Sequence, residues 1–373
     1  MCGEGYGHSS RDMGLAKELT NSGCEVLMGS YGYVLDRIKK SFNSVEIKKE
    51  LGMVGKEGIF DIKATISKSS GSALSFPKII SHETKIIKAF KADCVVADVR
   101  ACAVLAAFRL GIPCIIISNQ TSLEHFFKNS AIFLRLFGNG IELMMECMMA
   151  LADEILIPDF PPPYTVCNNT LTKNRHVMNK QRFIGPVVSM NVENQIQPGT
   201  PEQPFILTIL GGHSFRFPIF NSIIKLADRF PDFTFIILSP FKSSKIPGNV
   251  KILGFVEDIS SYMREARLII TQAGHTTAME ILALGKPALI IPDKGQIEQE
   301  INAARMKELG VCETLYYTSL DTESLFRKIN ILLNDSRFLE KAKKYSAMAK
   351  KIEGCKKGAD IILKLSDGSH QEI

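Results

Sequence analysis

A stretch suited to binding an anion runs from Thr271 to Ala303. A short apolar segment gives way there to a turn of small and polar residues, TQAGHTT, and a helix-compatible segment follows over residues 278–284. A Gly-Lys-Pro sequence then leads into a second apolar segment, which completes one βαβ unit. Open α/β sheets bind ligands at the carboxyl ends of their strands, where free N–H groups at a helix start favour negative charge. A diphosphate is therefore the first ligand to expect.

A glycine-rich segment opens the sequence. Gly3, Gly5 and Gly7 alternate with other residues, His8 follows them, and a helical pattern covers residues 12–21. Glycines at alternate positions allow close backbone approach, so this segment is either a ligand-binding loop or a plain tight turn. Such a turn normally follows a buried strand. We expect that strand to lie upstream of the first residue given, the alternative being a domain that lacks it.

Strand-like and helix-like segments alternate along both halves of the chain. In the first half, residues 94–97 are apolar and end at Asp98, a helix is predicted over residues 101–110, and another apolar segment follows. The second half begins the same pattern again with residues 205–210. Strands that alternate with helices predict a parallel, doubly wound sheet. The expected fold class is therefore α/β, with two Rossmann-like domains.

The segment between the halves is the best candidate for a linker, because it is polar and contains Asn, Gln, Pro and Gly. We expect a first domain over residues 1–186, a linker over 187–204, a second domain over 205–345, and a C-terminal helix and tail over 346–373. The last amphipathic segment, residues 338–365, is long enough as one helix to reach back across a cleft between the domains.

The composition is that of a globular protein with free thiols. In 373 residues, 45% are hydrophobic and 23% are charged, which is enough for two cores. The net charge of +6 suits anionic substrates or anionic lipid but is too diffuse to indicate nucleic acid. The nine cysteines include no CxxC pair and no Cys/His cluster at zinc spacing, which favours a reducing cytosol. With no signal peptide and no apolar run of about eighteen residues, we expect no membrane span.

Residues 126–151 are the most apolar stretch of the chain. The charges there, Lys128, Arg135, Glu142 and Glu146, are mostly about seven residues apart and fall on one narrow stripe of a helix. Two interpretations stay open. The helix is either buried on most sides, with a break at the Gly-Asn-Gly sequence, or it presents an apolar surface to a lipid-linked acceptor or a membrane.

These features together resemble the nucleotide-sugar glycosyltransferases of the GT-B fold. The chain is similar to glycosyltransferase family 28 and the UDP-glycosyltransferases, and most of all to their archaeal-type branch. The likeness covers nearly the whole chain and is specific in its second half, where the donor signature of that family is present in order: Gly274-His275-Thr276-Thr277, Glu280, Gly285-Lys286-Pro287 and Glu298-Gln299. The resemblance implies two doubly wound domains that face a cleft.

The resemblance assigns roles to the donor residues. Gly274 lets the backbone approach the diphosphate, and Thr276 and Thr277 bond its oxygens. Glu280 accepts the ribose hydroxyls, while Glu298 and Gln299 bond the hydroxyls of the transferred sugar.

The sequence departs from the plant-type signature at Gln272, where a phosphate-binding histidine is expected, and His275 either compensates or only packs. Two further loops match the family pattern. Phe255 and Val256 would hold the base, and the phosphate loop after the first strand of the domain would contribute Gly211, Gly212 and Ser214.

The resemblance also places the catalytic groups. His8 matches the general base of related inverting transferases, since histidine titrates in the range needed to take a proton from an acceptor hydroxyl. Asp98 matches the acid that orients this histidine, although an aspartate at a strand end is also a common helix cap. No Asp-x-Asp element is present, so neither a metal nor another cofactor is expected, and helix dipoles and hydroxyls would stabilise the departing diphosphate.

The sequence therefore predicts an inverting glycosyltransferase that moves a sugar from a nucleotide donor, UDP-linked by expectation, to an acceptor hydroxyl. On the second interpretation of residues 126–151, the acceptor is lipid-linked. The expected location is cytoplasmic, with peripheral contact at the inner membrane face and no nucleic-acid partner. The alternatives are an enzyme like the UDP-N-acetylglucosamine 2-epimerases and a non-catalytic sugar-nucleotide-binding protein.

Overall fold

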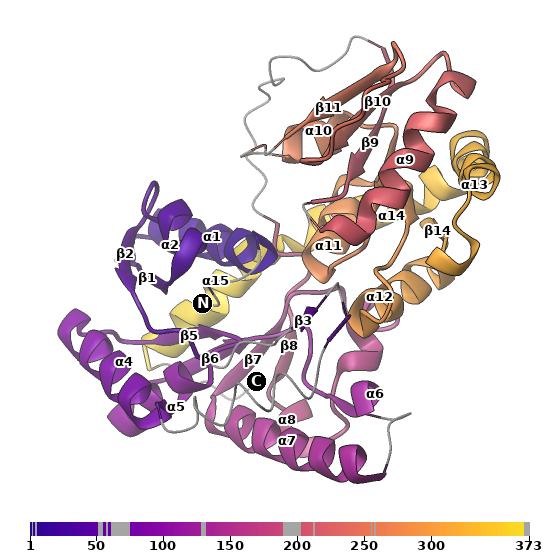
Figure 1. Cartoon of the computed structure of the whole chain (residues 1–373). Helices are drawn as coiled ribbons and strands as arrows, with labels where there is room; N and C mark the ends of the chain where they lie inside the picture. Colours follow the sequence, from indigo (N-terminus) through magenta and orange to yellow (C-terminus); the bar gives the residue numbers. More distant parts are fainter. Residues whose placement is uncertain are drawn as a thin grey trace. The chain divides into compact units, whose positions relative to one another are not determined.

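A computed structural model of the chain describes Met1, Gly3 and residues 6–50, 55–56, 59–60, 75–127, 132–188, 203–211, 213–254, 256 and 259–368. The chain divides into two compact units (Figure 1). Unit 1 comprises Met1–Val54, Asp61–Ser189 and Ile352–Ile373, and unit 2 comprises Gly55–Phe60 and Met190–Lys351. Each unit is built around parallel strands, as the alternation of strands and helices in the sequence predicts.

Unit 1 contains two separate parallel sheets. A two-stranded sheet pairs β1 (Leu27–Ser30) with β2 (Asn43–Glu46). A four-stranded sheet has the order β5-β6-β7-β8, and all of its neighbours are parallel. Its strands are β5 (Val95–Asp98), β6 (Cys114–Ile117), β7 (Glu154–Ile157) and β8 (Gln181–Phe183). The short antiparallel pair β3 (Gly55–Lys56) and β4 (Ile59–Phe60) belongs instead to unit 2.

The four-stranded sheet of unit 1 is buried on both faces, as a parallel sheet must be. Alternate residues of β6 point to opposite faces. Ile116 packs with helices α5 and α7, while Ile115 and Ile117 pack with α1 and α15. Figure 1 shows α1 and α15 side by side on that second face. The helices of unit 1 are α1 (Tyr6–Asn21), α2 (Gly32–Ile38), α4 (Phe76–Phe90), α5 (Ala101–Leu110), α6 (Glu124–Phe127), α7 (Ile132–Leu151), α8 (Arg175–Met178) and α15 (Gly354–Ser366).

The main sheet of unit 2 has six parallel strands in the order β11-β10-β9-β12-β13-β14. Its main core cluster packs α9 and α13 against apolar strand residues such as Phe235 and Ile270. The strands are β9 (Phe205–Ile209), β10 (Thr234–Leu238), β11 (Val250–Leu253), β12 (Leu268–Thr271), β13 (Ala288–Ile290) and β14 (Cys312–Thr314). The helices are α9 (Phe217–Leu226), α10 (Ser260–Glu265), α11 (His275–Leu284), α12 (Ile297–Glu308), α13 (Thr322–Asn334) and α14 (Ser336–Ile352).

Three helix predictions were wrong. The first helix begins at Tyr6 and not at residue 12, so His8 and Arg11 lie in its first turns and not in a glycine-rich loop. Helix α7 runs without a break through Gly138, whose missing side chain leaves room for the Phe127 ring: a Cβ built there would lie 2.3 Å from it.

The predicted C-terminal helix is two helices, α14 and α15. Glu353 adopts the left-handed conformation with φ 53°, which interrupts the helical hydrogen bonds. The next residue, Gly354, lies so close to the segment after β8 that a Cβ on it would stand 2.2 Å from the Pro186 carbonyl oxygen. This close approach fixes where α15 begins.

The polar segment predicted as a linker lies mostly outside the described residues, which resume at residue 203. The strand expected before the first helix is likewise not among them: neither Met1 nor Gly3 belongs to a strand.

Candidate active site

His8, Arg11 and Asp98 form a polar cluster in unit 1, at the carboxyl edge of the four-stranded sheet. His8 and Arg11 are three residues apart on α1, so they share one face of that helix. Asp98 is the last residue of β5. Asn119 joins them from the loop after β6, the neighbouring strand. Parallel strands place their carboxyl ends at the same edge, and that is why groups far apart in the sequence meet here.

The Asp98 carboxylate is the centre of this cluster. Its Oδ1 lies 3.0 Å from Nδ1 of His8, and its Oδ2 accepts a hydrogen bond from Nε of Arg11 at 2.7 Å. Nη1 of Arg11 donates to Oδ1 of Asn119 at 2.9 Å. Asp98 is only 1% exposed and Arg11 only 2%, so the ion pair is shielded from water. The predicted pairing of His8 with Asp98 is thus present, with Arg11 as a third member.

His8 is the exposed member of the cluster. Its side chain is 31% accessible, and its Nδ1 faces both Asp98 and Nη2 of Arg11, which lies 2.9 Å away. When the proton is on Nδ1, the ring donates it to Asp98 and leaves Nε2 unprotonated. A histidine held in this tautomer can accept a proton at Nε2 from a hydroxyl group.

Burial and charge act in opposite directions on Asp98. Burial by itself raises the pKa of this carboxyl, but the Arg11 guanidinium and then His8 outweigh burial and hold the pKa well below its usual range. The neighbouring Asp12 behaves in the opposite way, because burial, followed by the charge of Asp98, raises its pKa well above the ordinary value. Asp98 is therefore the ionised carboxylate of the pair.

The backbone after Asp98 is strained. Val99 has φ 49°, a left-handed conformation that a β-branched residue rarely adopts. Arg100 follows at the N-cap of α5 and is buried with Glu83, whose carboxylate accepts a hydrogen bond from its Nε at 3.1 Å. Strain of this kind persists only where surrounding contacts impose it, and it is common at functional sites.

The second candidate region is the turn between β12 and α11 in unit 2. Ala273 has φ 59°, and its carbonyl accepts a hydrogen bond from Nδ2 of the fully buried Asn302 at 3.2 Å. The buried Nε2 of Gln272 has no hydrogen-bond partner among the described residues. An unpaired buried amide costs about 1–3 kcal/mol, so this donor is suited to a ligand oxygen.

Helix α11 begins at His275, three residues earlier than the sequence pattern predicts, with Gly274 as its N-cap. Thr276 and Thr277 therefore lie in its first turn, where backbone N–H groups have no partner within the helix. His275 is buried, whereas the two threonines and Glu280 are half-buried. The predicted diphosphate residues are thus gathered at one helix start.

A partly buried ion pair connects three loops at the same edge of unit 2. Nε of Arg216 donates to Oδ1 of Asp293 at 2.9 Å, and Arg216 also donates to the carbonyl of Leu210. Asp293 follows β13, and its backbone N–H donates to Oε1 of Gln299 at 2.8 Å. Gln299, predicted as a sugar contact, is held by this network at the start of α12, and Glu298 lies half-buried beside it.

The remaining predicted donor residues fall in the loops after β9 and β11. Gly211 has φ 61°, which favours glycine, and Ser214 is exposed at the start of a 3-10 turn. Val256 is half-buried. Gly212 and Phe255 lie outside the described residues.

Arg11, Asn119, Arg216 and Asp293 were not predicted as site residues. The spacing of His8 and Arg11 on one helix face could have indicated Arg11 if the start of α1 had been predicted correctly. Asp293 closely follows the buried strand β13, much as Asp98 ends the buried strand β5, and this position is a signal that sequence reasoning could have used.

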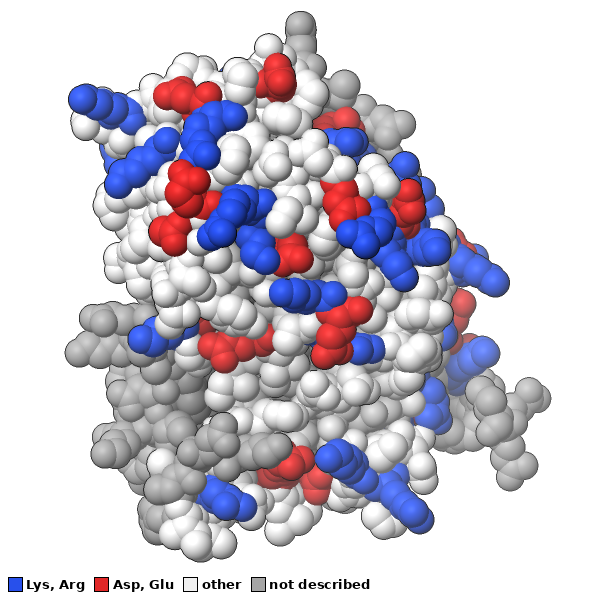
Figure 2. All heavy atoms as spheres, turned by 90° about the vertical axis from the view of Figure 1, so that its right-hand side faces the viewer, with Lys and Arg blue, Asp and Glu red and all other residues white. Residues whose placement is uncertain are grey.

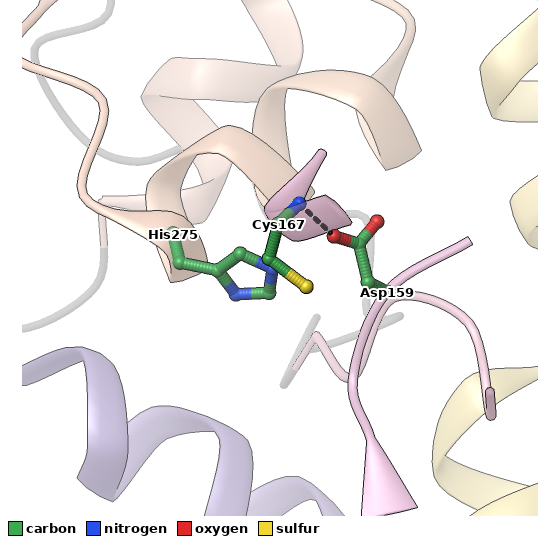
Figure 3. A group of neighbouring side chains, drawn as sticks. All are labelled: Asp159, Cys167 and His275. Atoms are coloured by element: carbon green, nitrogen blue, oxygen red, sulfur yellow. Dashed lines mark hydrogen bonds between the residues drawn. The ribbon is translucent and has the colours of Figure 1, made fainter. Parts of the chain in front are cut away.

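A third carboxylate in unit 1 organises a loop. Asp159 follows β7 and accepts hydrogen bonds from the backbone nitrogens of Phe160, Val166 and Cys167, the last at 2.8 Å (Figure 3). Because both carboxylate oxygens are used, Asp159 fixes the path of the proline-containing loop over residues 160–167.

Helix α7 of unit 1 has its acidic residues turned inward. The hydroxyl of Ser122 donates to Glu142, and the hydroxyl of Thr172 and the amide of Asn174 donate to Glu146. The outward side carries large apolar residues, with Ile132 78% exposed and Leu136 66%. Among the described side chains of this helix, Phe137, Leu143 and Met144 are further large apolar residues that are exposed. Helix α7 is thus not buried on most sides.

No helix among the described residues is long and apolar enough to cross a membrane. On the face of the molecule drawn in Figure 2, basic and acidic side chains are interspersed, so no large field of one sign forms there. This distribution agrees with the diffuse net charge of the sequence.

Comparison with protein families gives two matches. Residues 235–360 match the glycosyltransferase family 28 C-terminal domain, and residues 1–175 match a glycosyl transferase family 1 domain. A glycosyltransferase of Methanosarcina mazei, recorded as uncharacterized, is 37% identical over 98% of this chain and 97% of its own length. A Bacillus thuringiensis UDP-N-acetylglucosamine–N-acetylmuramyl-(pentapeptide) pyrophosphoryl-undecaprenol N-acetylglucosamine transferase is 24% identical over 73% of each chain.

Solved structures show the same fold. The glycosyltransferase of kitacinnamycin has a TM-score of 0.74 at 17% identity and covers 98% of this chain and 97% of its own. The glycosyltransferase VinC, solved in complex with dTDP, has a TM-score of 0.66 at 14% identity and covers 99% and 98%. These likenesses establish the fold as GT-B, as predicted.

Replacing Arg11 tests the charge balance of the cluster. Arg11→Met leaves the buried Asp98 carboxylate without its cation, so we expect the free energy of unfolding at pH 7 to fall by about 3–5 kcal/mol. In the wild type, the pKa of Asp98 is lower in the folded state than in the unfolded state, where it is about 3.9. The ionised Asp98 therefore adds to the free energy of unfolding at pH values above about 3.9. In Arg11→Met, burial without the cation raises the pKa of Asp98. Protonation of Asp98 then removes the cost of burying its charge, so the loss of unfolding free energy relative to the wild type shrinks as the pH falls toward about 4–5.

Urea unfolding of both proteins between pH 4.5 and 8 measures this deficit. Arg135→Met, which changes an exposed arginine of α7, is the control and should show little change at any pH. A deficit in Arg11→Met that does not vary with pH would contradict the assignment of Asp98 as the buried charge.

Proposed function

This chain belongs to the glycosyltransferases of the GT-B fold, and from that premise we propose that it is an inverting enzyme that transfers a sugar from a UDP-linked donor to a hydroxyl of a lipid-linked acceptor. The observation that carries the proposal is the cluster of His8, Asp98 and Arg11. It places a partly accessible imidazole against a buried, ionised carboxylate, which is the arrangement that a general base requires.

In the proposed mechanism, Nε2 of His8 takes the proton of the acceptor hydroxyl while its oxygen attacks the anomeric carbon of the donor sugar. The bond between that carbon and the diphosphate breaks in the same step, so the configuration at the anomeric carbon inverts. Asp98 orients the ring and stabilises the imidazolium that forms. Arg11 keeps Asp98 ionised throughout.

Unit 2 is proposed to hold the donor. The first turn of α11 and the Nε2 of Gln272 would contact the diphosphate, because a helix start has N–H groups without a partner inside the helix and Gln272 Nε2 is a buried donor without a partner among the described residues. Glu280, one turn further, would accept the ribose hydroxyls. The uridine base is supported by the UDP-N-acetylglucosamine transferase relative, and VinC offers dTDP as the alternative to test.

We propose that the departing diphosphate is stabilised by these dipoles and hydroxyls and that no metal ion or other cofactor takes part. An excess of EDTA should then leave the transfer rate unchanged. A rate that falls with EDTA and returns with added Mg²⁺ would overturn this part of the proposal.

The lipid-linked acceptor is supported by the outward side of α7. Four large apolar side chains, Ile132, Leu136, Leu143 and Met144, are more than half exposed there, and an apolar surface of this kind suits a lipid chain or the edge of a bilayer. The Bacillus thuringiensis relative is named for a pyrophosphoryl-undecaprenol substrate. The described cysteines are all free, as in a reducing compartment, so we propose peripheral binding at the cytoplasmic face of the membrane.

Two substitutions separate catalysis from donor binding. We expect His8→Ala to lower the transfer rate by about 10²–10⁴-fold, the usual contribution of a general base, with the Kd for UDP nearly unchanged. Glu280→Ala should instead weaken UDP binding by about tenfold, since it removes a charged acceptor from the ribose.

Transfer assays with isothermal titration of UDP and dTDP measure both effects. Full transfer activity in His8→Ala would remove this residue from the role of base. Unchanged UDP affinity in Glu280→Ala would count against the ribose contact, and tighter binding of dTDP than of UDP would correct the donor base.

A double substitution on α7 tests the lipid surface. Leu136→Glu with Leu143→Glu places two charges on the outward side, so we expect binding to vesicles that contain phosphatidylglycerol to fall by about tenfold or more. Ile331→Glu, which changes an exposed apolar residue on α13 of unit 2, is the matched control and should bind as the wild type does. Equal loss in both variants, or none in the first, would contradict a lipid-binding role for α7.

A further inference from the structure

Asn119 holds the guanidinium of Arg11 on a different side from Asp98. Nε and Nη2 of Arg11 donate to Asp98, whereas its Nη1 donates to Oδ1 of Asn119 at 2.9 Å. A guanidinium is planar and presents its N–H groups in a fixed fork, so acceptors on two sides determine its orientation. Asn119 is only 8% exposed, and its contact with Arg11 is therefore shielded from water.

The orientation of Arg11 affects where the neutral ring of His8 carries its proton. Nη2 of Arg11 is 2.9 Å from Nδ1 of His8, and Oδ1 of Asp98 is 3.0 Å from the same nitrogen. If Nη2 donates to Asp98, Nδ1 can carry the proton and donate to Asp98 as well. If Nη2 turns and donates to Nδ1, this nitrogen must be unprotonated, and the proton is on Nε2. Only the first arrangement leaves Nε2 able to take a proton.

The loop that carries Asn119 is buried although it forms neither helix nor strand. Residues 118–123 connect β6 with α6, and Thr121 and Ser122 are 0% and 7% exposed. The backbone N–H groups of these two residues both donate, at 2.9 Å, to the carbonyl of Thr170. The Thr170 hydroxyl donates in turn to the Asn119 carbonyl at 2.8 Å. Because buried backbone groups need such partners, Thr170 fixes the path of the loop at Asn119.

Helix α7 reaches this loop and its partner segment with two glutamates. Oε1 of Glu142 accepts a hydrogen bond from the Ser122 hydroxyl at 2.6 Å. Glu146 accepts from the hydroxyl of Thr172 and from Nδ2 of Asn174, the latter at 2.8 Å. The two glutamates are four residues apart and share one face of α7. One helix face therefore holds both segments through charged acceptors, which make stronger hydrogen bonds than neutral ones.

Covering these two segments would not require carboxylates. Glu142 and Glu146 are half-buried, and a carboxylate that loses part of its hydration does so at a cost in free energy. Apolar side chains cover a loop without this cost, and α7 is rich in them. Directional hydrogen bonds instead fix positions, and the group that they fix at the active site is the amide of Asn119.

We propose that Glu142 and Glu146 are positioning residues of the active site: they hold Asn119 against Arg11, and Asn119 thereby keeps the proton of His8 on Nδ1. The inference rests on the proposed role of His8 as the base, because it explains how the base acquires the tautomer that proton transfer needs. Neither glutamate is proposed to touch the substrate. The effect passes from α7 to the loop, from the loop to Asn119, and from Asn119 to Arg11.

The tautomer of His8 tests the proposal directly. It is measured by ¹⁵N NMR of the full chain with labelled histidine, at a pH where the ring is neutral, and the signals are assigned with His8→Gln. For the wild type we expect the form protonated at Nδ1. Asn119→Leu has nearly the shape of asparagine but cannot accept from Arg11. In this variant the ratio of the Nδ1-protonated to the Nε2-protonated ring should fall by about tenfold, the effect of one lost hydrogen bond.

The two glutamates are tested in the same way. Glu142→Leu and Glu146→Leu remove the charged acceptors from separate segments, and each should lower the tautomer ratio by about threefold. Glu142→Gln keeps an acceptor and should retain the wild-type ratio. Glu340→Leu breaks a serine–glutamate hydrogen bond of the same kind on α14 of unit 2, so it is the matched control and should leave the ratio unchanged.

A double variant tests whether the glutamate acts through Asn119. Glu142→Leu combined with Asn119→Leu should give the same tautomer ratio as Asn119→Leu alone, because the contact that Glu142 supports is already lost. A clearly lower ratio in the double variant would contradict the proposed route.

Three further outcomes would overturn the proposal: a wild-type ring protonated at Nε2, a wild-type ratio in folded Asn119→Leu or in both glutamate-to-leucine variants, and an equal effect in Glu340→Leu. The NMR measurement needs neither donor nor acceptor, so it is independent of the transfer assay. Full transfer activity in His8→Ala would remove the proposed base without changing the tautomer result, and the two failures can therefore be told apart.

Discussion

A carboxylate as deeply buried as Asp98 needs a cation beside it, and much of the candidate active site follows from that need. Removing a charge from water without a partner costs several kcal/mol, so Arg11 must lie against Asp98. Arg11 can do so because α1 begins at Tyr6 and turns this face toward the sheet edge. The same face carries His8, and the pairing of Arg11 with Asp98 therefore sets the position of the imidazole as well.

The two units use the same local geometry for different chemistry. In each, a residue with positive φ follows a buried strand: Val99 after β5 and Ala273 after β12. Each strained residue precedes a helix, α5 or α11, and each is held by buried polar contacts nearby. In unit 1 the strand edge presents a carboxylate that orients a base. In unit 2 it presents a helix start and an amide donor suited to phosphate oxygens.

Much of the fold could be predicted from the sequence, because strand and helix periodicities are local. The bounds of α5 agree with the helix predicted over residues 101–110, and the parallel strands of unit 2 follow from the alternation. The start of α1 could not be predicted because Gly7, His8 and the serines after it are weak helix formers, and tertiary contacts decide there. The break at Glu353 depends on how closely Gly354 approaches Pro186, which the sequence does not express.

Only those site residues that match the family pattern could be predicted from the sequence. His8 and Asp98 were expected and lie together, but the contact of Arg11 with Asp98 joins residues 87 positions apart and needs the fold. The hydrogen bonds between Asp293 and Gln299 likewise depend on how the loop after β13 lies against α12. Long-range polar contacts of this kind leave no periodic signal, so the sequence shows the residue types and the structure shows their partners.

The central claim is that a buried, ionised Asp98 orients His8 as the base for transfer. The single-turnover transfer rate of Asp98→Asn, measured together with its Kd for UDP, tests this most directly. We predict a rate lower by about 10²–10⁴-fold with the UDP affinity preserved, because the amide keeps the shape of the group but neither holds the proton on Nδ1 nor stabilises the imidazolium. A folded Asp98→Asn protein that transfers sugar at the wild-type rate would contradict the account.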